Sequence, residues 1–131
     1  MTTQITTAPN RQEIKSLFEK QRAHQFAVAR TAASERIQKL QKLKSAILER
    51  RQAIRDAVYA DFKKPAAEAD LTEIYAITTE IKHTARHLKK WMSRHSVGTP
   101  LPFLGSSSWV QYEPKGVCLI IAPWNFPLQL A

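Results

Sequence analysis

The residues that interrupt helices are unevenly distributed along this 131-residue chain, and this distribution constrains the fold more than any other feature. Six of the seven prolines and all three glycines lie from Pro65 onward. Because proline and glycine punctuate regular structure, the first half is free to form long helices. We expect a mainly α-helical chain with two β-strands near its C-terminus.

Three helices are expected. Residues from about Arg11 to Ala33 are rich in good helix formers. Ser34 could cap a second helix, in which apolar residues recur every three or four positions for more than twenty residues. Lys64-Pro65 should end it, since the residue before proline avoids helical geometry. Asp70 and Glu73 then have the spacing of a capping box at the start of a third helix.

The composition changes after the third helix. Residues 95–108 have a loop-like content of glycine, proline and serine. Trp109–Glu113 alternates large and polar residues, which is typical of a partly exposed strand. Val117–Ala122 is uniformly apolar, which is typical of a strand buried on both faces in a parallel sheet.

These patterns divide the chain into four parts. We expect a flexible tail over residues 1–10, a helical part over residues 11–94, a loop with an exposed strand over residues 95–116, and a buried strand with the segment after it over residues 117–131.

The chain is strongly basic, with a formal net charge of +9. Residues 1–64 hold 14 Lys and Arg against 6 Asp and Glu, so most of the excess lies on the predicted helices. A basic helical region can bind nucleic acid or an acidic surface, but no nucleic-acid-binding motif accompanies the charge. We favour solvated helix faces, without nucleic acid as a partner.

Three observations bear on location. A single cysteine excludes an internal disulfide framework and favours a reducing compartment. Residues 1–10 lack the basic and apolar regions of a secretory signal. The longest apolar stretch, Val117 to Trp124, is far shorter than the ~20 residues needed to span a bilayer. We therefore expect a cytoplasmic protein without a transmembrane segment.

Asn125 is the first candidate for chemistry, because it follows the predicted buried strand. An amide N–H held rigidly between Trp124 and Pro127, away from bulk water, can stabilise an oxyanion that develops on a carbonyl. From spacing alone the alternative is stronger, since Asn after a strand is usually a turn residue that bonds its own backbone.

The histidines do not indicate a metal site. His83 and His87 are four residues apart and could share a helix face, but no third ligand stands at a suitable spacing. We expect exposed helical histidines and no metal.

Residues 113–127 carry a family resemblance. Their sequence, Glu-Pro-Lys-Gly-Val-Cys-Leu-Ile-Ile-Ala-Pro-Trp-Asn-Phe-Pro, resembles the aldehyde dehydrogenase segment in which Glu-Pro-x-Gly-Val leads into Pro-Trp-Asn-Phe/Tyr-Pro. Shorter helical segments resemble the class 3-like branch, which includes fatty, benzaldehyde and coniferyl aldehyde dehydrogenases; they are Arg36-Ile-Gln-Lys-Leu, Ala60-Asp-Phe-Lys-Lys, Glu73-Ile, Glu80-Ile and Leu88-Lys-Lys-Trp91. The likeness covers about residues 11 to 131.

The resemblance implies that this chain is an N-terminal fragment of an α/β enzyme with a Rossmann-like cofactor domain. Such an enzyme oxidises an aldehyde to a carboxylate with NAD or NADP, through a cysteine thiohemiacetal and a thioester. Residues 11–94 then form the helical part of the cofactor-binding domain, and residues 107–113 an oligomerisation-type strand. A homodimer is implied at full length. The identity of the aldehyde and the choice between NAD and NADP are left open.

The resemblance also assigns residues. Asn125 matches the asparagine whose amide helps hold the thiohemiacetal oxyanion. Ile121, Ala122, Pro123 and Trp124 match a strand end that lines the nicotinamide side of the cofactor pocket, largely through backbone; simple packing remains an alternative for Trp124.

Cys118 does not match the family nucleophile, which lies later in a glycine-flanked loop. Its neighbours Val117 and Leu119 are apolar, and no His, Lys or helix N-terminus adjoins it in sequence to lower its pKa. We interpret Cys118 as a buried structural thiol. The nucleophile and the general-base glutamate fall outside this sequence, so we expect the isolated fragment to be inactive. A nucleic-acid-binding protein and a non-catalytic family remnant stay as alternatives.

Overall fold

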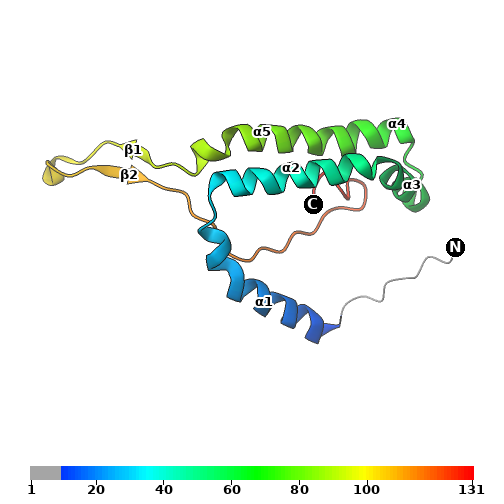
Figure 1. The fold of residues 1–131 in the computed structure, drawn as a ribbon, viewed down its shortest axis with the longest axis horizontal. Helices are drawn as coiled ribbons and strands as arrows, with labels where there is room; N and C mark the ends of the chain where they lie inside the picture. Colours follow the sequence, from blue (N-terminus) through cyan, green and yellow to red (C-terminus); the bar gives the residue numbers. More distant parts are fainter. Residues whose placement is uncertain (1–9) are drawn as a thin grey trace. The chain divides into compact units, whose positions relative to one another are not determined.

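The structure is a computed structural model that describes residues 10–131 (Figure 1). The flexible tail expected over residues 1–10 lies outside the described residues, apart from Asn10. The chain divides into two compact units. The first ends at Thr31 and also contains Pro114–Leu119, whereas the second contains Ala32–Glu113 and Ile120–Ala131.

The first unit is built on helix α1, Arg11–Ala29. The Asn10 carboxamide oxygen accepts hydrogen bonds from the backbone N–H groups of Gln12 and Glu13, and Glu13 accepts from the Asn10 N–H in return. This capping box satisfies donors that the first helical turn leaves unpaired. The predicted first helix is therefore confirmed.

Residues 114–119 lie along α1 within this unit. Gly116 has a φ of 110°, and a Cβ there would lie 2.6 Å from Oε1 of Gln25. The positive φ favours glycine at this position, whereas the flexible Gln25 side chain can move away from a larger residue. The apolar residues around it are Ile14, Leu17, Phe18, Val117 and Leu119, which line a groove of about 530 Å³.

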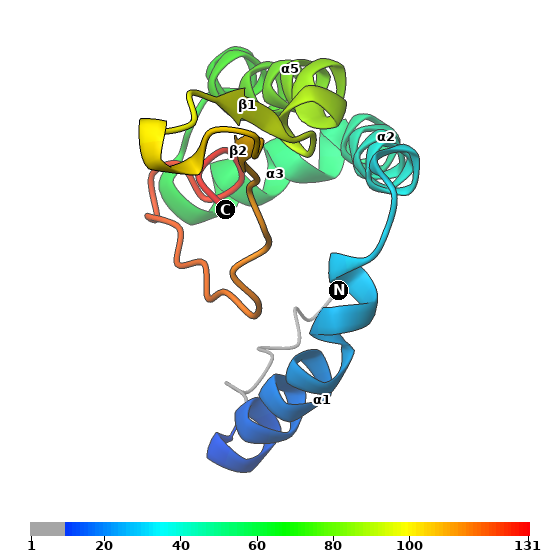
Figure 2. The same ribbon diagram turned by 90° about the vertical axis from the view of Figure 1, so that its left-hand side faces the viewer.

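The second unit is a helical layer. Helices α2, Ala33–Glu49, and α5, Ala76–Trp91, pack side by side (Figures 1 and 2). Helix α3, Arg51–Phe62, and the short α4, Ala66–Ala69, contact each other beside them. A π-helical segment, η1, Asp70–Tyr75, joins α4 to α5.

The core of the second unit lies between α2, η1 and α5. It consists of Ile47, Ile74 and Ile81, which are each about 95% buried. Leu128 from the C-terminal segment packs against the same cluster. This contact fixes the C-terminal segment on the helical layer.

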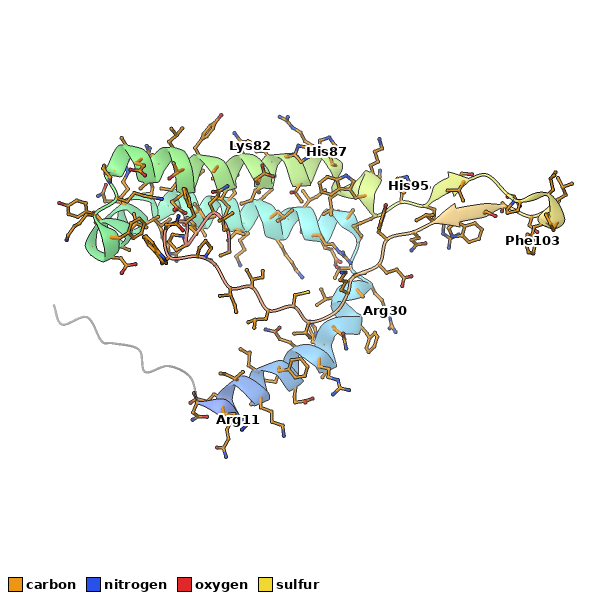
Figure 3. All side chains as sticks on the ribbon, turned by 180° about the vertical axis from the view of Figure 1, so that it is seen from behind. Arg11, Arg30, Lys82, His87, His95 and Phe103 are labelled. Carbon is orange, nitrogen blue, oxygen red and sulfur yellow. The ribbon has the colours of Figure 1, made fainter. Side chains whose placement is uncertain are left out.

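A β-hairpin follows α5 (Figure 1). Strands β1, His95–Val97, and β2, Ser108–Val110, are antiparallel, with Ser96 opposite Trp109. A 3₁₀-helix, η2, Leu101–Phe103, forms the tip, where the labelled Phe103 lies in Figure 3. The Arg94 guanidinium lies 4.6 Å from the Trp109 ring centroid and donates a hydrogen bond to Gln111, so it anchors the base.

The helical character is confirmed, but four local predictions are wrong. The N-cap of α2 is Ala32 rather than Ser34, because Glu35 reaches back to accept the Ala32 N–H. The long second helix breaks at Arg50, whose ψ of 15° redirects the chain so that α3 packs on α4 while α2 packs on α5.

The third error concerns Asp70, which does not cap a helix. Pro65 is the N-cap of α4, and its extended ψ of 149° places the helix start upstream of Asp70. Asp70 and Glu73 therefore both lie inside a continuous helical path, where their side chains are available for other contacts.

The fourth error concerns the strands. β2 overlaps the predicted strand at residues 109–113, but residues 95–97, expected in a loop, pair with it. Residues 117–122, expected as a buried strand, form no strand, and Leu119 and Ile121 are 84% and 83% exposed. A parallel strand requires a neighbour for its hydrogen bonds, and none lies beside this segment within residues 10–131.

Candidate active site

Asn125 lies in the turn that follows Pro123, within the second unit. The Phe126 N–H donates to the Pro123 carbonyl at 3.3 Å, and the Leu130 N–H donates to the Phe126 carbonyl at 3.3 Å. These bonds fold residues 123–130, which we call the Asn125 turn. Within residues 10–131 the Asn125 side-chain amide makes no hydrogen bond and is exposed.

The exposure of Asn125 differs from the expectation that it would be shielded from water. Within residues 10–131 this side chain is exposed to solvent. The amide is consequently free to donate to an external acceptor, while its backbone is held by other residues.

Lys64 holds one side of the Asn125 turn. Its ammonium is buried, with a side-chain exposure of 3%, and it donates to the Asn125 carbonyl at 2.9 Å. It also donates to Glu73 Oε1 at 2.7 Å and to Thr72 Oγ1 at 3.2 Å. These three bonds use all three donors of a lysine ammonium. The Phe126 ring, 4.2 Å away, adds a cation–π contact.

Glu73 holds the other side of the turn. Its side chain has an exposure of 0%, and Oε2 accepts the backbone N–H groups of Leu128 at 3.1 Å and Gln129 at 2.9 Å. Its other oxygen accepts from Lys64. The carboxylate is therefore bonded through both oxygens, as a buried charge must be.

Local backbone geometry brings this pair together. Lys63 ends α3 in the left-handed conformation, with a φ of 64°, and Pro65 then begins α4. Lys64 is thus fixed between a left-handed residue and a proline. Glu73 lies in η1, whose π-helical hydrogen bonds add a residue to the turn and change the direction of its side chains relative to an α-helix.

Trp124 is fixed by a contact with α3. Its ring lies 5.9 Å from that of Phe62 at an interplanar angle of 84°, an edge-to-face arrangement. The side chain is nevertheless 73% exposed, so it packs on the helix with one edge and leaves the rest uncovered.

Sequence reasoning missed Lys64 and Glu73. In the sequence, Lys64 marks a helix end and Glu73 a capping box, and both stand in segments that carry the family resemblance, but nothing there assigns either a role at the site. The usable signal was the pair itself: a lysine next to a helix break and a glutamate nine residues later, beside the apolar Ile74. Only the fold brings both to the Asn125 turn, which is more than fifty residues away.

Other candidates fall outside this cluster. Cys118 is exposed, so the expected burial is wrong; it lies in the first unit, in a segment that forms no strand. The centroids of the His83 and His87 rings are 4.3 Å apart, and His87 Nδ1 lies 2.8 Å from the His83 carbonyl oxygen. No three side chains of metal-binding type gather within residues 10–131.

The profile of the aldehyde dehydrogenase family matches residues 2–131. The chain belongs to the aldehyde dehydrogenase family. It is 37% identical over 107 residues to aldehyde dehydrogenase family 3 member I1, chloroplastic, of Arabidopsis thaliana, covering 81% of this chain and 20% of that protein. It is 40% identical over 95 residues to the 4,4'-diaponeurosporen-aldehyde dehydrogenase of Staphylococcus aureus, covering 72% of this chain and 21% of that protein.

A solved structure agrees. The substrate-bound state of Staphylococcus aureus AldH superposes with a TM-score of 0.84 at 36% identity, covering 89% of this chain and 26% of that one. The described chain is thus part of the aldehyde dehydrogenase fold, and it spans about a fifth to a quarter of the length of these relatives.

Two of the residues expected to line a cofactor pocket, Ile121 and Trp124, are 83% and 73% exposed, and residues 120–123 form neither helix nor strand. The three glycines, at positions 98, 105 and 116, do not form a phosphate-binding turn. No helix in the described part is long and apolar enough to cross a membrane.

Proposed function

We propose that this chain is the N-terminal part of an NAD(P)-dependent aldehyde dehydrogenase. In the complete enzyme Asn125 donates its side-chain N–H to the oxyanion that forms when a cysteine thiolate adds to the aldehyde. The observation that carries the proposal is an unpaired, exposed amide on a turn whose backbone is held by the buried Lys64 and Glu73. A donor with a fixed base and a free N–H is suited to oxyanion stabilisation.

The cofactor role belongs to Ile121, Ala122, Pro123 and Trp124. The cofactor, when bound, accepts the hydride and so supplies the oxidising power. The exposed Ile121 and the Trp124 ring, which packs against Phe62, provide a surface that the cofactor can contact. The proposed role of Asn125 defines the substrate only as an aldehyde whose carbonyl oxygen can reach the Asn125 amide.

The isolated 131-residue piece is expected to be inactive. The cysteine in this sequence, Cys118, lies in a different unit from Asn125, and large apolar side chains such as Leu119 and Ile121 are exposed. These observations support a catalytic apparatus completed by further sequence. We place the complete enzyme in the cytoplasm, in keeping with the free Cys118, which forms no disulfide within residues 10–131.

Nucleic acid is not proposed as a partner. Arg51 and Arg55 both pair with Asp70, and Lys64 is buried against Glu73, so three of the basic residues of this region are paired with carboxylates. A non-catalytic remnant remains the rival that the experiment must exclude.

The test is an assay of the complete protein with a panel of aldehydes and with NAD and NADP, monitored by reduced cofactor. Asn125→Ala is expected to lower kcat by about 10²–10³-fold with little change in aldehyde KM, since the donor acts mainly in the transition state. The 131-residue piece serves as the inactive control. Absence of turnover by the complete protein would favour the remnant.

A further inference from the structure

The buried charges at Lys64 and Glu73 contact the Asn125 turn at Asn125 itself and at Leu128 and Gln129. The Lys64 ammonium binds the carbonyl of Asn125 itself, and the Glu73 carboxylate binds the N–H groups of the residues three and four positions later. The turn is therefore held by three charge-assisted hydrogen bonds, one to Lys64 in the connection between α3 and α4 and two to Glu73 in η1. Such bonds are shorter and stronger than neutral ones.

Stability alone is a poor reason for this arrangement. Removing two charges from water costs several kcal/mol each, and apolar residues of similar volume often stabilise a core equally well. Unlike an apolar pair, the ion pair forms directional hydrogen bonds. Each of its bonds to the turn fixes the position of one backbone group. The donor required for oxyanion stabilisation must be held within fractions of an ångström.

Two further contacts limit the movement of the pair. The third ammonium donor is bound to Thr72 Oγ1, whose own hydroxyl donates to the Glu68 carbonyl at 2.8 Å. The Phe126 ring covers the ammonium from the turn side. The lysine and the turn thus fix each other, and the Lys64 ammonium retains no unpaired donor that would allow an alternative position.

We propose that Lys64 and Glu73 are positioning residues that hold the backbone of the Asn125 turn and thereby direct the Asn125 amide at the reacting carbonyl oxygen. The inference rests on the proposed function and extends it to two residues that touch neither substrate nor cofactor.

The test uses the complete enzyme and a double-mutant cycle. The variant Lys64→Met/Glu73→Leu removes the bonds to the turn without leaving a buried charge unpaired, and it is combined with Asn125→Ala. Glu73→Asp is a second variant, which keeps a negative charge near Lys64 but withdraws the carboxylate by one methylene from its partners, including the N–H groups of Leu128 and Gln129. The matched control is Asp70→Asn, a paired carboxylate in the same π-helical segment whose partners, Arg51 and Arg55, lie on α3.

The expected results are specific. Lys64→Met/Glu73→Leu should lower kcat by up to about 10²-fold with little change in aldehyde KM, as a small misplacement of a catalytic group does. In the Asn125→Ala background the same change should cost less than about threefold, because the group being positioned is absent. The Leu128 and Gln129 amides should exchange hydrogen faster in both Lys64/Glu73 variants, whereas Asp70→Asn should leave kcat and these amides unchanged.

Three outcomes overturn the inference. Equal losses of kcat in the two backgrounds would show a general structural effect and leave the proposed function intact. Unchanged kcat in both Lys64→Met/Glu73→Leu and Glu73→Asp would show that the turn needs no such support. Undiminished turnover in Asn125→Ala would remove the role of Asn125, whereas a complete wild-type protein without turnover would overturn the proposed function itself.

Discussion

At the scale of single residues, Lys64 and Glu73 show how a buried charge pair can depend on distant backbone. Lys64 and Glu73 are each more than 90% buried. Besides the bond between them, Lys64 donates to Thr72 and to the Asn125 carbonyl, and Glu73 accepts from the N–H groups of the Asn125 turn. Breaking such a pair differs in energy from replacing it, because only the former leaves an uncompensated charge in the interior.

Removing one member of the pair should therefore be costly. Glu73→Gln leaves the Lys64 ammonium without its counter-charge and is expected to lower the free energy of unfolding by about 3–5 kcal/mol. Lys64→Met/Glu73→Leu should stay within about 2 kcal/mol of wild type, since no charge is left unpaired. Urea unfolding of the complete protein measures both. A cost below 1 kcal/mol for Glu73→Gln would contradict the burial of the ion pair.

Lys63 is a second residue at which local geometry has an energetic consequence. It occupies the left-handed region, with a φ of 64°, directly after α3. Glycine removes the steric cost of that conformation, so Lys63→Gly is expected to raise the free energy of unfolding by up to about 1 kcal/mol. The same change at Lys39, exposed inside α2, should lower it by about 1 kcal/mol. Denaturant unfolding of the two variants distinguishes a helix end from a helix interior.

At the scale of elements, the junction of α3 with η1 is held by ion pairs on its outer side. Arg51 and Arg55 both present Nε and Nη2 to the Asp70 carboxylate, with distances of 2.8 Å and 2.7 Å for Arg51. Hydrogen bonds from Arg51 and then Arg55 hold the pKa of Asp70 well below its ordinary value of 3.8. The charged form of Asp70 is therefore the one that stabilises the fold.

This lowered pKa predicts a direction of pH dependence. A carboxyl whose pKa is lower in the folded state stabilises the fold above its unfolded value, and the contribution is lost as pH falls below that value. The difference in unfolding free energy between wild type and Asp70→Asn should accordingly be present at pH 7 and shrink at pH 3. The Arg51→Met/Arg55→Met background should abolish the effect. A difference that grew on acidification would contradict the ion pairs.

At the scale of the whole molecule, the described chain buries few apolar residues and exposes many. The buried ones are Ile47, Val58, Ala69, Ile74 and Ile81. The hairpin that follows α5 exposes Leu101, Phe103 and Leu104 at its tip and Trp109 on β2. Exposed apolar patches of this kind mark contact surfaces. We propose that the complete aldehyde dehydrogenase forms a homodimer to which this hairpin contributes.

The dimer proposal has a direct test. Replacing Leu101, Phe103 and Leu104 by serine removes apolar contact area from the hairpin tip and should shift the complete protein from dimer to monomer. Sedimentation velocity at several concentrations measures the shift. Tyr75→Ser, at a residue 62% exposed on η1, is the matched control and should leave the mass unchanged. A wild-type protein that is monomeric at every concentration would contradict the proposal.

Helix content was predictable from sequence because its causes are local. The placement of proline and glycine and the three-to-four spacing of apolar residues both act within a few positions. The break at Arg50 was not predictable, since no proline or glycine marks it and the partners of α2 and α3 decide it. The strand expected at residues 117–122 is absent for a similar reason, because it depends on a distant partner. An apolar sequence favours a buried strand, but a strand forms only where a second strand provides its hydrogen bonds.

The sequence by itself determined the family, the candidate Asn125 and the helical character, because a short motif and local periodicity carry that information. Only the tertiary structure decided which groups surround Asn125. Lys64 reaches its carbonyl across 61 residues, and Glu73 reaches Leu128 across 55. Contacts between residues so far apart leave no periodic signal in the chain, because they depend on how α3, η1 and the Asn125 turn pack together.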